Sequence, residues 1–372
     1  MSRIGSLVAV AFVLSLGALL LFASTRYTYE QPLPIKLGTS GGNVHDRTSM
    51  YCCSGTLGAL VSKNGTQYIL SANHVLARSS QAAIGEDISQ PGLVDTNCGT
   101  KAYHVVADLS KFVRLGGSTN VDAAIARVRP GTVNSGGAIM TVGRPSKTPI
   151  VGAVSMHVAK VGRTTGLTCG NIGATNVSVK VEYSTKCGGG STFTVLYTNQ
   201  LLINGSKFSA AGDSGSLILR AGSAQPVGLL YAGSSTTTVA NRIQDVSKAF
   251  GGLSFVGGAN HAIACPAASG ATSQAATVEL PGPSAEALAR AEVVRQAHEA
   301  ELLSDGSVQA VGLGSSEESS TEPAIVVVVD QSRYHGGVPA FVEGVKTRVV
   351  RTDAIRAFGW NEPAEGHACR AQ

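Results

Sequence analysis

The chain is poor in aromatic and charged residues. Of its 372 residues, 5% are aromatic and 14% are charged, which argues against long, charged, solvent-exposed helices. The 45 glycines instead favour many short strands joined by tight turns. The formal net charge is +5, but lysine and arginine are scattered and form no dense basic run, so no nucleic-acid partner is expected.

Several short chemical motifs are also missing. The eight histidines are dispersed, with no H-E-x-x-H or C-x-x-C spacing, so no metal site is expected. There is no glycine-rich phosphate loop either. The sequence therefore predicts no cofactor.

The N-terminus carries one long apolar run, from residue 4 to residue 22. Such a run is long for the core of a signal peptide and just long enough to span a bilayer. The sequence Leu21-Phe-Ala-Ser24 is a weak cleavage site, because Leu21 stands where a small residue is usual. We expect an extracytoplasmic protein whose residues 1–24 are either a cleaved signal peptide or a retained membrane anchor.

Seven cysteines suit an exported, oxidised protein. Cys52 and Cys53 are adjacent and cannot both face one ligand, so disulfides are favoured over a metal site. The pairs we expect are Cys53 with Cys98, Cys169 with Cys187, and Cys265 with Cys369. This leaves Cys52 unpaired, and spacing alone does not fix the connectivity.

The clearest local signal is a β-hairpin. Asn64-Gly65 stands between the apolar runs 56–61 and 67–70, and both turn positions of such a hairpin need a positive φ. The second run leads directly into Ser71-Ala-Asn-His74. His74 is therefore expected just past a strand, held firmly but near the surface.

Short strand-like runs continue along the chain in two groups. They are residues 102–109 and 123–128, and, after a Gly/Pro-bearing crossover at 130–148, residues 153–161, 177–183, 193–203, 215–219, 227–232 and 237–243. Two groups of short strands separated by a crossover predict two antiparallel β-barrels over residues 51–258. Residues 25–50 are polar and glycine-bearing and are expected to be a linker.

The composition changes again near the C-terminus. Residues 259–283 are rich in Ala, Ser, Gly and Pro, which predicts a second linker. Residues 284–372 then predict a small α+β domain, with a helix at 284–303 and strands at 308–313, 324–329 and 345–350. This domain would act as an intramolecular chaperone or inhibitor that contacts the barrels, or as a module that binds a partner or a surface.

Gly212-Asp-Ser-Gly215 is the candidate catalytic loop. A serine hydroxyl becomes nucleophilic when a base takes its proton and backbone N–H groups hold the resulting oxyanion. Because Gly212 has no side chain, its N–H and that of Ser214 can converge on one point. The alternative is an ordinary Gly/Ser/Asp turn.

Two further residues complete a catalytic set. His74 could instead be a satisfied histidine at a strand end, and Asp122 could simply cap a turn before a buried strand. Together, the segments Leu70-Ser-Ala-Asn-His74, Val121-Asp-Ala-Ala-Ile125 and Gly212-Asp-Ser-Gly-Ser216 resemble the three catalytic blocks of trypsin-like serine proteases, in that family's chain order. Residues 162–170 look like the opening of the second barrel in bacterial members.

The resemblance implies a fold and a role for each residue. It covers about residues 50–258 and implies a chymotrypsin-like domain of two six-stranded antiparallel β-barrels. Ser214 would be the nucleophile, His74 the general base and Asp122 its orienting partner, with the N–H groups of Gly212 and Ser214 as the oxyanion hole. Asp213 would shape the loop. The implied partner is a protein or peptide substrate.

This sequence departs from the family in places. Val75 stands where many animal members have cysteine, and Ser216 replaces the commoner glycine, as in bacterial branches. No activation peptide is evident. The resemblance puts the substrate pocket near Phe208, Ser209, Tyr231 and Gly233, without an acidic residue at its floor, so an apolar pocket is expected; Phe208 could equally belong to the core.

The sequence thus predicts an exported serine endopeptidase. The alternative is a binding or scaffold protein that keeps a protease fold with little or no turnover. The enzyme would be favoured if the His74 side chain lay within hydrogen-bond distance of both Ser214 and Asp122, with an open cleft beside Gly212.

Overall fold

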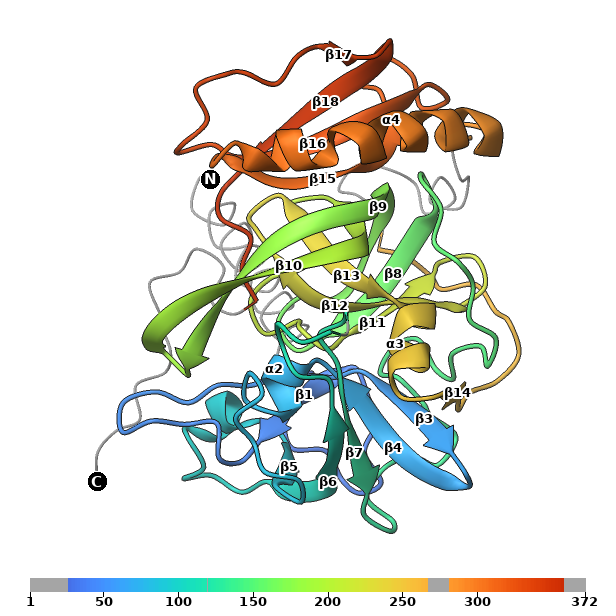
Figure 1. Cartoon of the computed structure of the whole chain (residues 1–372). Coiled ribbons are helices and arrows are strands. Elements are labelled where there is room, and N and C mark those ends of the chain that lie inside the picture. Colours follow the sequence, from blue (N-terminus) through green and yellow to red (C-terminus); the bar gives the residue numbers. More distant parts are fainter. Residues whose placement is uncertain (1–25, 119, 267–280, 358–372) are drawn as a thin grey trace, which may run out of the picture.

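The computed structural model consists of two β-barrels stacked on one another and an α+β unit at one end (Figure 1). It describes residues 26–118, 120–266 and 281–357. The prediction of a mainly β fold, with two antiparallel barrels followed by a small α+β unit, is confirmed. The expected leader or anchor at 1–24 lies outside the described residues. Among those described, no helix is both long and apolar enough to cross a membrane.

The predicted hairpin forms as the sequence indicates. Strands β3 (Ala59–Lys63) and β4 (Thr66–Ser71) pair antiparallel, with Lys63 opposite Thr66. Asn64 and Gly65 turn between them with φ of 49° and 78°. Both positions are left-handed, as a two-residue hairpin turn requires.

The first barrel closes through one bent segment. Its elements are β1 (Thr39–Asn43), β2 (Gly55–Leu57), β3, β4, β5 (Asp87–Gln90), β6 (His104–Phe112), β7 (Ala124–Val128) and β14 (Ser254–Phe255), with the short helices α2 (Asn73–Leu76) and η1 (Leu93–Thr96). Within the described chain the sheet order is β14-β3-β4-β7-β6-β5-β1-β2. Only Gly58 separates β2 from β3. Strand β2 pairs with β1 at one end of the order, and β3 pairs with β4 near the other end, so this continuous segment closes the barrel.

The prediction that residues 25–50 form a linker is wrong for residues 39–43. Residues 39–43 form β1, which is buried along its length and pairs with β2 and β5. Thr39-Ser-Gly-Gly-Asn43 carries no apolar signal, and it lies inside because its backbone pairs on both sides. A Cβ atom on Gly41 would stand 2.4 Å from Leu57 Cγ, so the close approach of β2 requires glycine there.

The second barrel closes through its longest hairpin. Its strands are β8 (His157–Gly162), β9 (Gly166–Lys186), β10 (Gly189–Asn204), β11 (Leu217–Arg220), β12 (Pro226–Gly233) and β13 (Thr237–Arg242), followed by helix α3 (Ile243–Ala249). In the described residues they run in the order β10-β13-β12-β11-β8-β9, and β9 also pairs with β10. The β9–β10 hairpin extends beyond the barrel, and its tip lies beside the first barrel (Figure 1).

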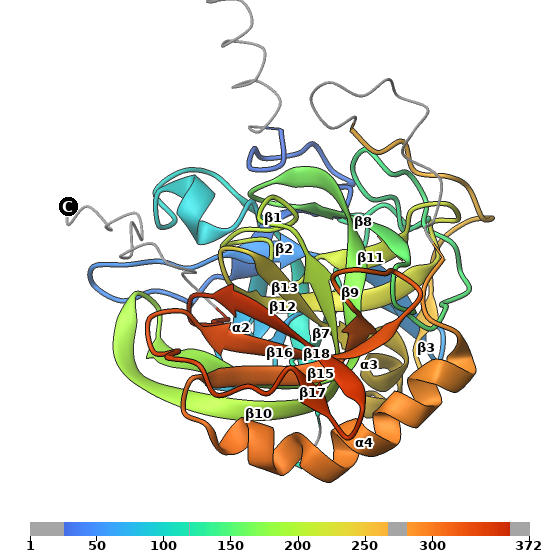
Figure 2. The same ribbon diagram turned by 90° about the horizontal axis from the view of Figure 1, so that it is seen from above.

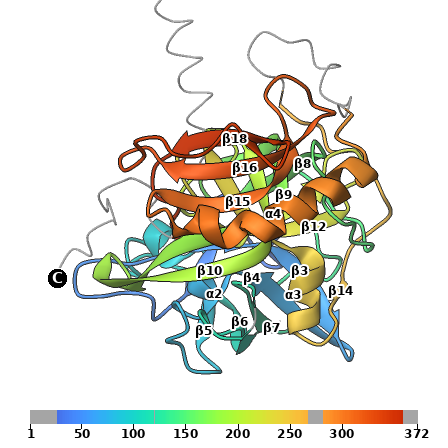
Figure 3. The same ribbon diagram turned by 45° about the horizontal axis from the view of Figure 1, so that its top comes forward.

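The C-terminal unit continues the sheet of the second barrel. It contains α4 (Ala285–Ser304), β15 (Val308–Ser315), β16 (Pro323–Asp330), β17 (Phe341–Val342) and β18 (Val345–Thr352). Strand β15 pairs antiparallel with β9, with Ala310 opposite Val179. The unit therefore extends the barrel wall, so that β9 lies between barrel and unit (Figure 3).

Helix α4 begins at an N-cap and covers one face of this unit. The Ser284 hydroxyl accepts a hydrogen bond from Ala287 N at 3.1 Å, which satisfies an N–H group of the first turn. The helix runs alongside β15 and β16 (Figure 2). Val327 packs in the core under α4, whereas Val326 and Val328 join the core of the barrels. Burial on both faces explains why 324–329 is a continuous apolar run.

The disulfide predictions were wrong in their pairing. Among the described residues the disulfides are Cys52–Cys98, Cys53–Cys187 and Cys169–Cys265. The predicted pairs Cys53–Cys98 and Cys169–Cys187 therefore do not form, Cys265 does not need Cys369, and Cys52 is paired. Cys369 lies outside the described residues.

The length of β9 explains the largest of these errors. Cys169 lies near the start of this 21-residue strand and Cys187 just beyond its end. At about 3.3 Å per residue, the two cysteines stand tens of ångströms apart. Cys187 instead ties the hairpin tip to Cys53 of the first barrel.

Candidate active site

His74 and Asp122 meet at one edge of the first barrel. Strand β4 ends at Ser71, which pairs with Ala124 at the start of β7, so the chain leaves one strand and enters the other at the same place. His74 Nδ1 and Asp122 Oδ2 lie 2.7 Å apart, and both side chains are fully buried. Asp122 Oδ1 also accepts hydrogen bonds from Asn73 N at 2.6 Å and His74 N at 3.4 Å. The carboxylate is thus oriented to hold the imidazole.

A tyrosine that the sequence analysis missed completes the surroundings of Asp122. The Tyr183 hydroxyl, on β9, donates to Asp122 Oδ2 at 2.8 Å and also contacts the Tyr197 hydroxyl at 2.8 Å. Burial, and then the charge of Asp122, raise the pKa of Tyr183 far above its usual range, so the phenol stays neutral and able to donate. No local motif marks Tyr183, because it belongs to an alternating strand 61 residues from Asp122.

The Ser214 loop is shaped by glycines at tight places. Gly212 and Gly215 have φ of 91° and 92°, a left-handed conformation that side chains disfavour. A Cβ atom on Gly58 would stand 2.0 Å from Gly215 O, so this glycine lets the first barrel approach the loop closely. Among the described residues, neither Gly212 N nor Ser214 N donates to a backbone acceptor. Within the described part of the chain both N–H groups thus lack a backbone acceptor, as a candidate oxyanion hole requires.

Asp213 is tied down behind this loop. Its Oδ2 lies 3.1 Å from Lys160 Nζ, and both side chains are fully buried. The carboxylate also accepts hydrogen bonds from Thr164 N at 2.8 Å and from Thr165 Oγ1 at 2.6 Å. Burial lowers the pKa of Lys160 and Asp213 opposes that shift. Lys160, which the sequence analysis also missed, thus supplies a buried internal cation to the loop.

The Ser214 loop packs against the segment that carries His74. Thr56 N donates to Ser214 O at 2.8 Å. A Cβ atom on Gly55 would meet Val75 Cγ2 at 2.4 Å and Ser214 O at 3.0 Å, so the serine and the neighbour of His74 flank the same glycine. The single proton of the Ser214 hydroxyl is directed at two backbone carbonyls, Tyr231 O at 3.4 Å and Ala357 O at 3.3 Å. The second of these acceptors belongs to the C-terminal segment. Among the described residues this hydroxyl makes no hydrogen bond to His74, so the expected Ser214–His74 contact stays a prediction.

The residues expected to line the substrate pocket lie in different surroundings. Phe208 packs in the core of the second barrel beside Ile203, which is the alternative that the sequence left open. Ser209 hydrogen bonds to Thr238, and the fully buried Tyr231 ring contacts Tyr197 edge-on at 5.1 Å. Gly233 pairs with Arg356 of the C-terminal segment. A substrate pocket at these four positions stays a prediction.

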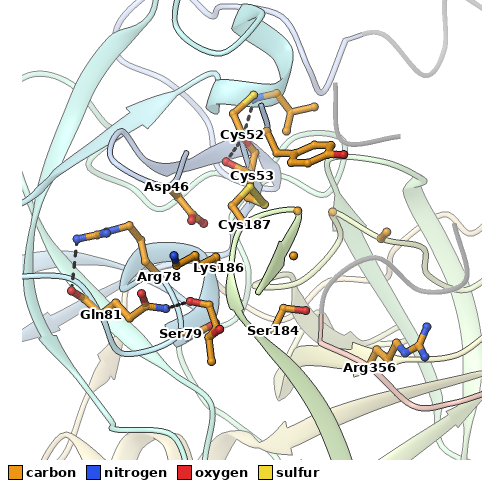
Figure 4. Close-up of a pocket in the computed structure, with 18 of the residues that line it drawn as sticks. Asp46, Cys52, Cys53, Arg78, Ser79, Gln81, Ser184, Lys186, Cys187 and Arg356 are labelled. Atoms are coloured by element: carbon orange, nitrogen blue, oxygen red, sulfur yellow. Dashed lines mark hydrogen bonds between the residues drawn. A yellow bond between two sulfur atoms is a disulfide. The ribbon is translucent and has the colours of Figure 1, made fainter. Parts of the chain in front are cut away.

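A cavity of about 570 Å³ opens beside the Ser214 loop (Figure 4). Its lining includes Gly212, Arg163, Glu182 and Arg356, together with the Cys53–Cys187 disulfide at the hairpin tip. Arg163 forms a two-pronged ion pair with Asp95, at 2.7 Å for each prong. The cavity thus lies between the first barrel and the β9–β10 hairpin, next to the candidate oxyanion hole.

Two groups of metal-ligand residue types come together in the described chain. They are His157 with Cys169 and Cys265, and Asp46 with Cys53 and Cys187. In both groups the two cysteine sulfurs are bonded to each other as a disulfide. A disulfide offers no thiolate, so neither group has the ligands of a thiolate metal site.

The chain matches a family model described as the Nal1 C-terminal domain over residues 99–247, which includes Asp122 and Ser214 but not His74. No curated protein matches the chain.

Solved structures give further similarities. A glutamic acid-specific serine protease is 18% identical, with a TM-score of 0.42, and the match covers 59% of this chain and 100% of that one. The alpha-lytic protease homolog N4 is 19% identical, with a TM-score of 0.41 and coverage of 59% and 98%. The Nocardiopsis protease NAPase is 15% identical, with a TM-score of 0.39 and coverage of 58% and 97%.

The chain is similar to bacterial chymotrypsin-fold serine proteases. The family resemblance expected from the sequence is thereby found among solved structures.

Proposed function

We propose that this protein is an exported serine endopeptidase that hydrolyses peptide bonds through Ser214, His74 and Asp122. The observation that carries the proposal is the buried 2.7 Å contact between His74 and Asp122, beside a loop whose Gly212 and Ser214 N–H groups lack a backbone acceptor among the described residues. The cavity next to Gly212 would admit a polypeptide.

The proposed reaction proceeds through an acyl-enzyme. Ser214 Oγ attacks the scissile carbonyl while His74 Nε2 takes its proton, and the N–H groups of Gly212 and Ser214 hold the oxyanion. His74 then returns the proton to the leaving amine, which departs as the C–N bond breaks. A water molecule, deprotonated by His74, attacks the ester carbonyl. The C–O bond to Ser214 then breaks, the acid leaves, and His74 returns the proton to Ser214 Oγ. Asp122 holds Nδ1 and stabilises the charged imidazolium.

An active-site probe tests this directly. A fluorophosphonate should label the wild type at Ser214 and leave Ser214→Ala unlabelled, and His74→Ala should also lose labelling because the base is missing. Peptide hydrolysis by Ser214→Ala should fall on the order of 10⁶-fold in kcat. Equal labelling of the wild type and Ser214→Ala would remove the proposal.

Export is part of the same proposal. Three disulfides among the described residues are typical of proteins that fold outside the reducing cytoplasm. Residues 1–24 would serve as a cleaved signal peptide or as a retained anchor. N-terminal sequencing of the protein from the medium and from membranes distinguishes the two, and intact cytoplasmic protein in reduced form would contradict both.

The second candidate is a protease-fold binding protein with little turnover. The specific observation in its favour is that a C-terminal segment reaches Ser214 and lies against Gly233. A chain that stays unlabelled when this segment is loosened would favour the binding protein over the enzyme.

A further inference from the structure

Residues 355–357 form an extended segment between β9 and the end of β12, where Arg356 makes isolated bridges to Glu182 and Gly233. On one side Gly233 N donates to Arg356 O at 3.0 Å and Arg356 N donates to Gly233 O at 2.9 Å. On the other side Glu182 N donates to Ile355 O and Ala357 N donates to Glu182 O, both at 3.1 Å. Four backbone hydrogen bonds thus hold three residues in an extended conformation, and Ile355 and Ala357 are buried.

The last described residue of this segment, Ala357, lies against the candidate nucleophile. The Ser214 hydroxyl donates to Ala357 O at 3.3 Å, so a carbonyl of the segment faces Ser214. The Arg356 side chain turns aside and pairs with Glu182, with 2.9 Å between Nε and Oε1. Glu182 and Arg356 both line the cavity beside Gly212. Figure 4 shows the Arg356 side chain among the residues that line it.

The C-terminal unit holds the segment in place from behind. Gln309, on β15, accepts from Ile355 N at 2.7 Å and donates to Asp353 O at 3.0 Å. Ser235 N donates to Asp353 Oδ1 at 2.9 Å. The segment follows directly from β18, so the sheet that extends the barrel also delivers the segment to Ser214.

We propose that Ile355–Ala357 occupy the position of a bound peptide substrate, and that Glu182 selects a basic side chain in that substrate where Arg356 now lies. The proposal deepens the proposed function, on which it rests. Backbone pairing on both sides binds any extended peptide, whereas the carboxylate of Glu182 distinguishes side chains by charge. The C-terminal segment accordingly competes with substrate within the same chain.

Competition within one chain is effective even when each contact is weak. A tethered segment has an effective concentration in the millimolar range, far above that of a dilute peptide. The Glu182–Arg356 pair is more than a third exposed, with side-chain exposures of 37% and 38%, so reversing one charge loosens the segment without removing it. Charge-reversing substitutions at Glu182 or Arg356 can therefore test the competition in the full chain.

The first experiment measures binding without catalysis. The probe is a fluorescently labelled peptide, Asp-Ala-Ile-Arg-Ala, which copies residues 353–357. Fluorescence anisotropy measures its dissociation constant from the full chain carrying Ser214→Ala. Adding Arg356→Glu should tighten peptide binding about fivefold, because the loosened segment yields the site. The matched control is Arg290→Glu, the same charge change at an exposed position of α4, which should leave binding unchanged.

Charge exchange tests the role of Glu182. In the Ser214→Ala, Arg356→Glu chain, a peptide with Glu in place of Arg should bind about fivefold more weakly than the original. In a Ser214→Ala, Glu182→Arg chain that retains Arg356, this preference should reverse. Equal binding of both peptides by every chain, or no saturable binding up to millimolar peptide, overturns the proposal.

The second experiment separates this proposal from the proposed function. With Ser214 intact, Arg356→Glu should raise the fluorophosphonate labelling rate about fivefold over the wild type, and Glu182→Arg with Arg356→Glu should return it towards the wild-type value. Mass spectrometry confirms that the C-terminal residues remain attached. Charge-selective peptide binding without labelling in any chain would support the peptide site and reject the protease. Labelling at the same rate in all chains would support the protease and reject the peptide site.

Discussion

The Tyr183 hydroxyl and Asp122 Oδ2 lie 2.8 Å apart, on the same carboxylate oxygen that contacts His74 Nδ1. Tyr183 comes from the second barrel, whereas Asp122 and His74 come from the first. The hydrogen bond therefore joins the two barrels at the candidate site. Glu182, the residue before Tyr183, points to the other face of β9 and pairs with Arg356. Strand β9 therefore carries both contacts.

The Tyr183 contact gives the first prediction. Tyr183→Phe removes a donor to a charged group while keeping the ring stacked on Phe193, so kcat should fall roughly 10- to 100-fold with KM little changed. Tyr197→Phe is the matched control, because that hydroxyl contacts Tyr183 rather than Asp122, and it should cost less than about threefold. Steady-state kinetics on one peptide measures both; equal losses would deny Tyr183 a special role.

The buried ion pair of Lys160 and Asp213 gives the second prediction. Lys160→Met leaves the Asp213 carboxylate buried without its cation and should lower the free energy of unfolding by about 3–5 kcal/mol. Adding Asp213→Asn should restore part of that loss, since the uncompensated charge disappears. Urea unfolding measures each variant. A double variant no more stable than Lys160→Met alone would contradict an electrostatic cause.

Asp46 gives a stability prediction that depends on pH. Burial raises the pKa of Asp46 to about 7, with Glu86 adding to the shift and Arg78 opposing it. The folded state therefore holds a proton that the unfolded state has lost, and wild-type stability should fall by about 3 kcal/mol from pH 5 to pH 8 through this group.

Asp46→Asn keeps the shape of the side chain and removes its charge. The variant should lose this part of the pH dependence and be more stable than the wild type at pH 8. Denaturant unfolding at pH 5 and pH 8 measures both chains. An unchanged difference between the two pH values would show that another group is responsible.

The disulfide at the hairpin tip gives the last prediction. Replacing Cys53 and Cys187 by serine should cost about 2–4 kcal/mol and also slow labelling of Ser214, because this hairpin carries Tyr183, which contacts Asp122. The Cys169–Cys265 disulfide is the control: its removal should cost stability alone. Calorimetry and probe labelling separate the effects, and equal labelling losses in the two variants would contradict the role of the tip.

Local features of the sequence determined much of the fold. Asn64-Gly65 specified a hairpin because only residues tolerant of positive φ fit that turn, and the apolar runs on either side specified its strands. The same patterns placed His74 after β4 and Asp122 before β7, and these two residues do meet. The predicted helix at 284–303 likewise forms, as α4, and the structure shows that the Ser284 hydroxyl caps its first turn.

Tertiary structure alone decided which distant groups meet. Strand β1 has no apolar pattern and is buried through backbone pairing, and the cysteine partners depended on how far β9 carries Cys187 from Cys169. Lys160, Tyr183 and Arg356 gain their partners only when the barrels and the C-terminal sheet pack together. Turn and strand signals depend on neighbours in sequence, whereas a buried charge or hydroxyl is satisfied by whatever the packed chain brings to it.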